Sequence, residues 1–135
     1  MPGPGILTNL WLKWLPSPLP PPGSYDGQRV LVVGGTTGLG LASAVHFLNL
    51  GAKEVVITAR SAARGQAAKE QIEAQTKTIG RGKVEVMDLD MSRYSSVVAF
   101  VNQLKSQRSE DGGLDCAVLS AGTHNAGFVL SPAGW

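Results

Sequence analysis

Four glycines crowd into the segment RVLVVGGTTGLG, residues 29–40, directly after an apolar run. Counted from Gly34, three of them have the spacing G-x-x-x-G-x-G. Glycine lets a backbone turn sharply and approach a ligand closely, and the free N–H groups of a following helix attract phosphate. Thr36 and Thr37 can donate hydroxyl hydrogen bonds to phosphate oxygens, or they can hold the turn itself. The segment therefore predicts a nucleotide-binding turn, with an ordinary tight turn as the alternative.

A basic residue follows the next apolar run. The segment TARSAAR contains Arg60, and no acidic residue occurs between Val55 and Lys69. In dinucleotide-binding folds, a carboxylate at this place binds the ribose 2′-hydroxyl of NAD, whereas a basic residue suits the 2′-phosphate of NADP. A guanidinium binds phosphate through two parallel charge-assisted hydrogen bonds. We therefore expect Arg60 to select NADP, the alternative being a solvated charge beside a helix.

Side chains that could carry acid–base or nucleophilic chemistry are few and scattered. The chain has two histidines, His46 and His124, and its serines lack a triad pattern. Asp88 and Asp90 are close in sequence, but we do not expect them to act as an acid–base pair. Cys116 is the single cysteine, which excludes an internal disulfide and a cysteine metal cluster. We predict no catalytic residue and no metal ligand.

Strand and helix patterns alternate along the chain from residue 28. Apolar, β-branched runs predict strands, and the stretches between them have helical spacing or an alanine-rich composition. Because the strands are apolar along nearly their whole length, we expect an α/β fold, a doubly wound parallel sheet with helices on both faces. The expected strands are residues 28–33, 53–58, 83–89 and 114–120, and the first two helices extend to about Leu50 and from residue 61 to 77.

Local signals refine the helices. Gly51 is typical of the end of a helix. For the helix after the third strand, we expect Ser92 or Ser95 to cap its start and one apolar side to face the core. The expected core-facing residues of that helix are Tyr94, Val97, Val98, Val101 and Leu104.

Three motifs, in this order, resemble those of the short-chain dehydrogenases/reductases. VVGGTTGLG resembles the family's T-G-x-x-x-G-x-G fingerprint, with Val33 where the family usually has threonine. MDLD, residues 87–90, resembles the acidic site after the third strand. LSAG, residues 119–122, resembles the N-N-A-G motif, with Ser120 in place of asparagine. The resemblance covers residues 26–135 and extends to fungal members through LDCAVLSAG and LSPAGW.

The resemblance implies a Rossmann-like sheet with strand order 3-2-1-4, truncated after the fourth strand. It also implies that NADP is the cofactor, with Asp88 accepting a hydrogen bond from the adenine amino group and Leu89 packing nearby. The fourth strand would then be an exposed apolar edge through which the chain could associate with others. The expected cofactor-binding residues are Gly34, Thr36, Thr37, Gly38, Leu39, Gly40, Arg60, Asp88, Leu89, Ser120, Ala121 and Gly122.

The family's catalytic motif is missing from this sequence. In the family, a tyrosine exchanges a proton with the substrate oxygen, and a lysine four residues later lowers its pKa. Tyr25 is followed by Arg29 at that distance, and Tyr94 by Val98. The resemblance therefore implies an NADP-dependent oxidoreductase of a carbonyl or alcohol, in fungal secondary metabolism by analogy, whose catalytic half is absent and which is inactive alone. A non-catalytic cofactor- or partner-binding remnant, or a non-functional product, are the alternatives.

The composition limits the classes of protein to which this chain can belong. The chain has 135 residues, 43% of them hydrophobic and 16% charged, which indicates one globular domain. A net charge of +2 does not support nucleic-acid binding. We expect a short helix and a proline-rich linker at residues 1–24, then an incomplete NADP-binding domain at residues 25–135. Finding neither a transmembrane segment nor a signal peptide, we expect a cytoplasmic protein.

Overall fold

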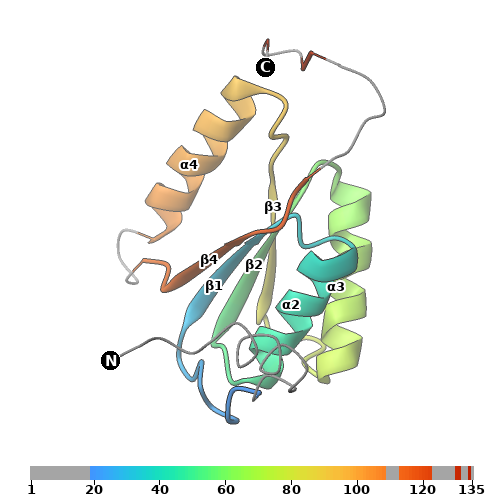
Figure 1. Ribbon diagram of the computed structural model, residues 1–135, viewed down its shortest axis with the longest axis vertical. Helices are drawn as coiled ribbons and strands as arrows, with labels where there is room; N and C mark the ends of the chain where they lie inside the picture. Colours follow the sequence, from blue (N-terminus) through green and yellow to red (C-terminus); the bar gives the residue numbers. More distant parts are fainter. Residues whose placement is uncertain (1–18, 109–112, 123–129, 132–133, 135) are drawn as a thin grey trace, which may run out of the picture.

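A computed structural model describes residues 19–108, 113–122, 130–131 and 134. These residues form a parallel sheet with helices on both faces (Figure 1). The strand order is β3-β2-β1-β4, as the resemblance implied. In chain order the elements are β1 (Arg29–Val33), α2 (Gly38–Asn49), β2 (Glu54–Ala59), α3 (Ala62–Thr76), β3 (Val84–Asp88), α4 (Tyr94–Arg108) and β4 (Cys116–Leu119).

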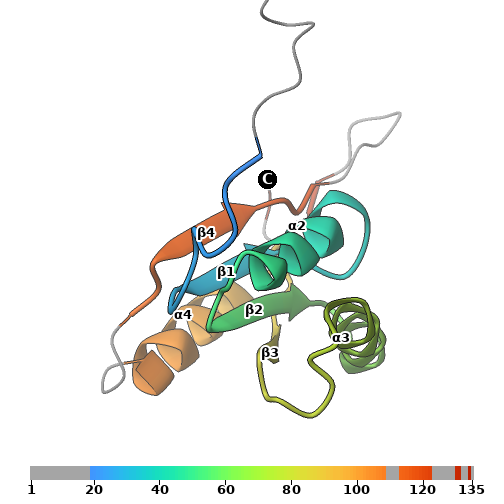
Figure 2. The ribbon, with the colours of Figure 1, turned by 90° about the horizontal axis from the view of Figure 1, so that it is seen from below.

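The two central strands are buried on both faces because helices cover both sides of the sheet. All five residues of β1 are buried, as are Val55 to Ala59 of β2. Successive side chains of a strand point to opposite faces, so β1 contributes to two separate cores. Figure 2 shows α2 and α3 on one face of the sheet and α4 on the other.

The core under α2 and α3 is the larger of the two. Val30 and Val32 of β1 pack there with Ile57 of β2. On the opposite face, Leu31 and Val33 pack with residues of β2, β3 and α4. The second core consists of Leu31, Val33, Val56, Met87, Leu89 and Phe100, with Val97, Leu104 and Leu114 packed against it.

The start of the described fold is attached to the end of α2. The ring of Tyr25 packs edge-on against Phe47, with 4.8 Å between ring centroids, and its N–H donates to the Leu50 carbonyl at 3.1 Å. Gly51 follows the helix with φ +100°, and a Cβ there would overlap the carboxylate of Asp26. Glycine at position 51 therefore meets both a conformational and a steric requirement, as expected at this helix end.

The expected core-facing side of α4 is partly wrong. Tyr94 is 66% exposed, and Val98 and Val101 are also exposed. The helix instead packs Val97 and the buried Phe100 on the sheet, together with Leu104. The two sets lie about a quarter turn apart around a helix of 3.6 residues per turn, and only the second set faces the sheet. The residues expected on one face therefore divide between core and surface.

The expected caps of α4 are also corrected. The helix begins at Tyr94, so Ser95 lies inside its first turn. Ser92 lies before the helix, and its hydroxyl donates to Asp90 Oδ1 at 2.7 Å. Neither serine occupies the capping position. In α3, by contrast, Ser61 accepts a hydrogen bond from the Arg64 N–H at 3.3 Å and caps the helix.

β4 lies at the edge of the sheet. It pairs with β1 in the register Val30↔Cys116 to Val33↔Leu119, and no other strand within the described ranges pairs with it. The Leu119 side chain is 78% exposed. Of the segment expected to form a short helix and a proline-rich linker, residues 1–18 lie outside the described residues, as does His124. In the described part of the chain, no helix combines the length and apolar character needed to cross a membrane.

Two isoleucines provide a matched test of this fold. Ile57 is fully buried, whereas Ile79 is 72% exposed. Because Ile57→Ala removes packed methyl groups, we expect it to lower the free energy of unfolding by about 2–5 kcal/mol. Ile79→Ala should change it by no more than about 0.5 kcal/mol. Urea unfolding of both variants measures the difference, and equal losses would contradict the assigned core.

Candidate functional site

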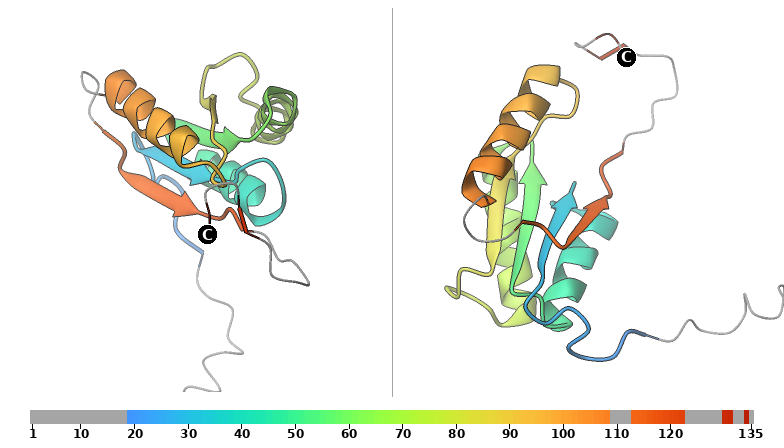
Figure 3. Two further views of the ribbon diagram at one scale, coloured as in Figure 1. Left: turned by 90° about the horizontal axis from the view of Figure 1, so that it is seen from above. Right: turned by 90° about the vertical axis from the view of Figure 1, so that its left-hand side faces the viewer.

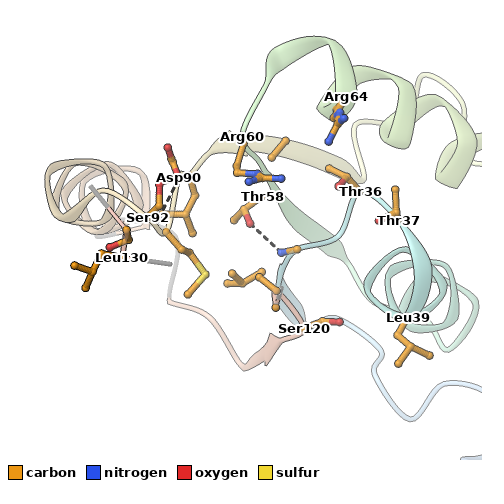
Figure 4. Close-up of a pocket in the computed structure, with 18 residues that line it drawn as sticks. Thr36, Thr37, Leu39, Thr58, Arg60, Arg64, Asp90, Ser92, Ser120 and Leu130 are labelled. Carbon is orange, nitrogen blue, oxygen red and sulfur yellow. Dashed lines mark hydrogen bonds between the residues drawn. The ribbon is translucent and has the colours of Figure 1, made fainter. Parts of the chain in front are cut away.

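A pocket of about 830 Å³ opens where the strands end (Figure 4). The strands run in one direction, so their carboxyl ends meet at one edge of the sheet (Figure 3). Ligands of open α/β sheets bind at this edge. The pocket is lined by Val33, Gly34, Thr36, Thr37, Leu39, Thr58, Ala59, Arg60, Arg64, Leu89, Asp90, Met91, Ser92, Ser120, Ala121, Gly122, Leu130 and Ser131.

Gly34 holds the backbone of three segments in close contact. Its φ is +85°, and a Cβ at this position would lie 2.8 Å from the Cα of Ala121. A Cβ on Gly40, in the first turn of α2, would overlap the carbonyl oxygen of Gly34. The Gly34 N–H donates to Thr58 Oγ1 at 3.0 Å. The turn therefore contacts the segment after β4, the start of α2 and the end of β2 at once.

The start of α2 presents amide groups that have no partner within the helix, next to this turn. The first intrahelical bond runs from the Leu41 N–H to the Thr37 carbonyl at 3.3 Å, so the N–H groups of residues 38–40 precede it. Gly38 has φ +56°, and a Cβ there would meet open space. Thr37 is extended and makes no side-chain cap. The positive end of the helix and two threonine hydroxyls are thus available to an anion.

Two arginines lie on the β2–α3 side of the pocket. Arg60 directly follows β2, and Arg64 is in the first turn of α3, which contains no acidic residue. Gly65 lets α3 approach the sheet, because a Cβ there would overlap Val86 Cγ1. Arg64 was not among the residues expected at the site. The spacing R-S-A-A-R, which places a second cation four residues after Arg60 at the start of a helix, is the signal that could have indicated it.

The two carboxylates near the end of β3 differ in their position relative to the pocket. Asp88 is exposed at the end of β3, opposite Ala59, and does not line the pocket. Leu89 is buried in the pocket wall, and its N–H donates to the Ala59 carbonyl at 2.9 Å. Asp90 does line the pocket, although it was not among the expected cofactor-binding residues.

Asp90 is held by the residues that begin α4. Its Oδ1 accepts hydrogen bonds from the Ser92 hydroxyl at 2.7 Å and the Ser92 N–H at 3.0 Å. These bonds lower the pKa of Asp90, and the positive charges of Arg93 and Arg60 act in the same direction. The Asp90 N–H donates to Ser96 Oγ at 2.9 Å. Asp90 is therefore an ionised carboxylate that shapes the loop between β3 and α4.

Most of the expected site residues come together around this pocket. Nine of the twelve line it, and the exceptions are Gly38, Gly40 and Asp88. Ser120 is held beside the turn by its N–H, which donates to the Val33 carbonyl at 2.9 Å. Leu39 is 82% exposed and gives the pocket mouth an apolar side chain. Gly38 and Gly40 shape the backbone of the site and contribute no wall.

The donor set fits a phosphorylated dinucleotide. Amide N–H groups and hydroxyls at the start of α2 suit a diphosphate, and two guanidiniums near the end of β2 suit a further phosphate. The described residues contain no group of three or more metal-ligating side chains. Tyr94 does not line the pocket. The described arrangement therefore suits an anionic ligand.

Comparison with known proteins identifies similar sequences. Residues 28–132 match the family described as short chain dehydrogenase. The chain is 33% identical over 135 residues to the short-chain dehydrogenase/reductase ffsI of Aspergillus flavipes, covering 100% of this chain and 38% of that protein. It is 37% identical over 115 residues to the short-chain dehydrogenase/reductase phmF of Phaeosphaeria nodorum, covering 85% and 33%. The chain thus spans well under half the length of these curated relatives.

Solved structures share the fold. The L-sorbose reductase of Gluconobacter frateurii, solved with NADPH and L-sorbose, matches with a TM-score of 0.63 and 26% identity. The match covers 79% of this chain and 38% of that chain. The menthone neomenthol reductase of Mentha piperita matches with a TM-score of 0.62 and 26% identity, covering 72% and 32%.

The hydrogen bonds to Asp90 predict a pH dependence. Because the folded-state pKa is lowered, Asp90 contributes stability above the ordinary carboxyl pKa of about 3.9, and this contribution is lost as the pH falls through the lowered value. Ser92→Ala removes the largest cause, so the pKa of Asp90 should rise toward its ordinary value. NMR titration of the carboxyl carbon measures it, with the exposed Ser95→Ala as control. An unchanged titration in Ser92→Ala would contradict the assigned hydrogen bond.

Proposed function

Because the chain belongs to the short chain dehydrogenase family, we propose that it binds NADP(H) as the cofactor-binding half of an oxidoreductase. The family binds nicotinamide cofactors, and one observation supports NADP rather than NAD as the cofactor of this chain. Arg60 and Arg64 both line the pocket at the place where an NAD site holds a carboxylate. β2 ends at Ala59 and Arg60 follows it, so neither residue supplies a carboxylate side chain for a ribose hydroxyl.

Each part of the pocket has a proposed role toward the dinucleotide. The N–H groups of residues 38–40, together with the Thr36 and Thr37 hydroxyls, bind the diphosphate. Arg60 and Arg64 bind the 2′-phosphate. The other proposed contacts come from the ends of three strands: Gly34 after β1, Asp88 and Leu89 toward adenine, and Ser120, Ala121 and Gly122 after β4, with Leu39 at the mouth of the pocket.

The proposed reaction is reduction of a carbonyl or oxidation of an alcohol. When bound, the nicotinamide ring supplies or accepts the hydride, and a protein acid must exchange a proton with the substrate oxygen. The sequence contains no tyrosine with a lysine four residues later. We therefore place the proton-transferring residues outside these 135 residues and propose that this chain alone does not turn over.

Arginine substitutions test the choice of cofactor. Arg60→Ala removes a charge-assisted phosphate contact worth about 1.5–3 kcal/mol, so NADPH affinity should fall by about 10- to 100-fold. NADH lacks the 2′-phosphate and should be little affected. Arg81→Ala is the matched control, because Arg81 is exposed in the loop between α3 and β3, away from the pocket.

Isothermal titration calorimetry with both cofactors measures these affinities. The proposal requires the ratio of NADPH to NADH affinity to fall in Arg60→Ala and to stay unchanged in Arg81→Ala. If the Arg60 variant keeps the wild-type ratio, the assignment of NADP is wrong. If the wild-type chain binds neither cofactor, the proposed function itself is wrong.

A further inference from the structure

We infer that Thr58 is a positioning residue, which fixes the glycine turn for the diphosphate and leaves 2′-phosphate recognition to the arginines. The observation behind this is a single hydrogen bond between two elements of the pocket. Thr58 Oγ1 of β2 accepts the Gly34 N–H at 3.0 Å (Figure 4). The inference rests on the proposed function, because the turn must bind a diphosphate for its position to matter.

The bond forms where β1 leaves the sheet. The pairing between β1 and β2 ends at Val32↔Ile57. The carbonyl of the next residue, Val33, points the other way, toward β4, and accepts the Ser120 N–H. Alternate N–H groups of a strand point to opposite neighbours, so the Gly34 N–H points toward β2. There a side-chain oxygen accepts it in place of a strand carbonyl. β1 can therefore turn away from β2 while the Gly34 N–H stays satisfied.

The Thr58 side chain is well placed for this task. Thr58 is only 4% exposed, so its neighbours limit its rotation. Val33, at the start of the turn, has no polar side-chain atom that could act instead. A half-buried N–H without a partner is unfavourable, so removal of the Thr58 oxygen should let Gly34 rotate to find another acceptor.

Such a rotation would move the diphosphate site as a unit. The Gly34 carbonyl packs directly against the backbone of Gly40, so displacement of Gly34 displaces the start of α2. The arginine side has attachments of its own, since Ser61 caps α3 and Gly65 packs against Val86 of β3 and Ala59 of β2. Loss of the Thr58 oxygen should therefore weaken every ligand that needs the diphosphate site and spare a ligand that needs only the arginines.

Three probes separate these effects. NADPH uses both the diphosphate site and the arginines, whereas NADH uses the diphosphate site without the arginines. Adenosine 2′-monophosphate uses the arginines and the adenine contacts without the diphosphate site. In Thr58→Val, which keeps the shape of the side chain, we expect NADPH and NADH affinities to fall by about tenfold, the loss of one hydrogen bond. The ratio between them and the affinity for adenosine 2′-monophosphate should not change. Thr58→Ser keeps the oxygen and should restore both cofactors.

Thr76→Val is the matched control. The Thr76 side chain is half-buried, and its hydroxyl donates to the Ile72 carbonyl at 2.8 Å and lies 2.8 Å from the Thr78 hydroxyl, but Thr76 does not line the pocket. Thermal unfolding shows whether each variant is folded at the titration temperature. If Thr76→Val weakens the cofactors as much as Thr58→Val, the effect is general destabilisation, and the inference is overturned.

The remaining outcomes also decide the inference. The inference is overturned if Thr58→Val binds NADPH with wild-type affinity, or if Thr58→Val loses as much affinity for adenosine 2′-monophosphate as for NADPH. It is also overturned if Thr58→Ser does not restore the affinity for NADPH and NADH. If Thr58→Val does not fold, amide hydrogen exchange in the wild type decides: Gly34 must exchange more slowly than Gly38, whose N–H precedes the helix bonds, and equal rates overturn the inference. A wild-type chain that binds none of the probes contradicts the proposed function instead.

Discussion

The close approach of backbone segments at Gly34 is the constraint on which the pocket depends. Gly34 alone contacts three segments: Ala121 after β4, the first turn of α2 and Thr58 near the end of β2. No side chain larger than hydrogen fits at Gly34 or Gly40 without moving backbone. Because the three segments are packed together, the N–H groups at the start of α2 have a defined place relative to the strand ends.

The charges around the pocket are separated in space. Two guanidiniums lie beside the end of β2, whereas the start of α2 offers only N–H dipoles and hydroxyl groups. Asp90 is the acidic side chain among the pocket-lining residues, and its Oδ1 is occupied by Ser92. This carboxylate stabilises the loop before α4, with Arg93 Nε 3.6 Å from its other oxygen. A ligand with phosphates at two places would meet a positive potential at each.

Local sequence patterns were sufficient for the elements and the glycine turn. The unbroken apolar runs of β1 and β2 identified buried strands, and Gly51 identified a helix end. The face of α4 was harder, because Tyr94 and Val98 have the same spacing to Val101 as core residues would have. Which apolar side of α4 is buried depends on how the helix packs against the sheet. In the same way, Arg64 and Thr58 acquire a role through contacts between elements, which neither spacing nor composition reveals.

The central claim is that the backbone at the start of α2 binds a dinucleotide diphosphate. Amide chemical shifts of the wild-type chain during titration with NADPH test it most directly. The account predicts saturable shifts that are largest for Thr37, Gly38 and Gly40, with residues 78–82 at the opposite end of β3 unchanged. The claim is contradicted if NADPH leaves the spectrum unaltered, or if it changes amide chemical shifts elsewhere but not those of the glycine turn.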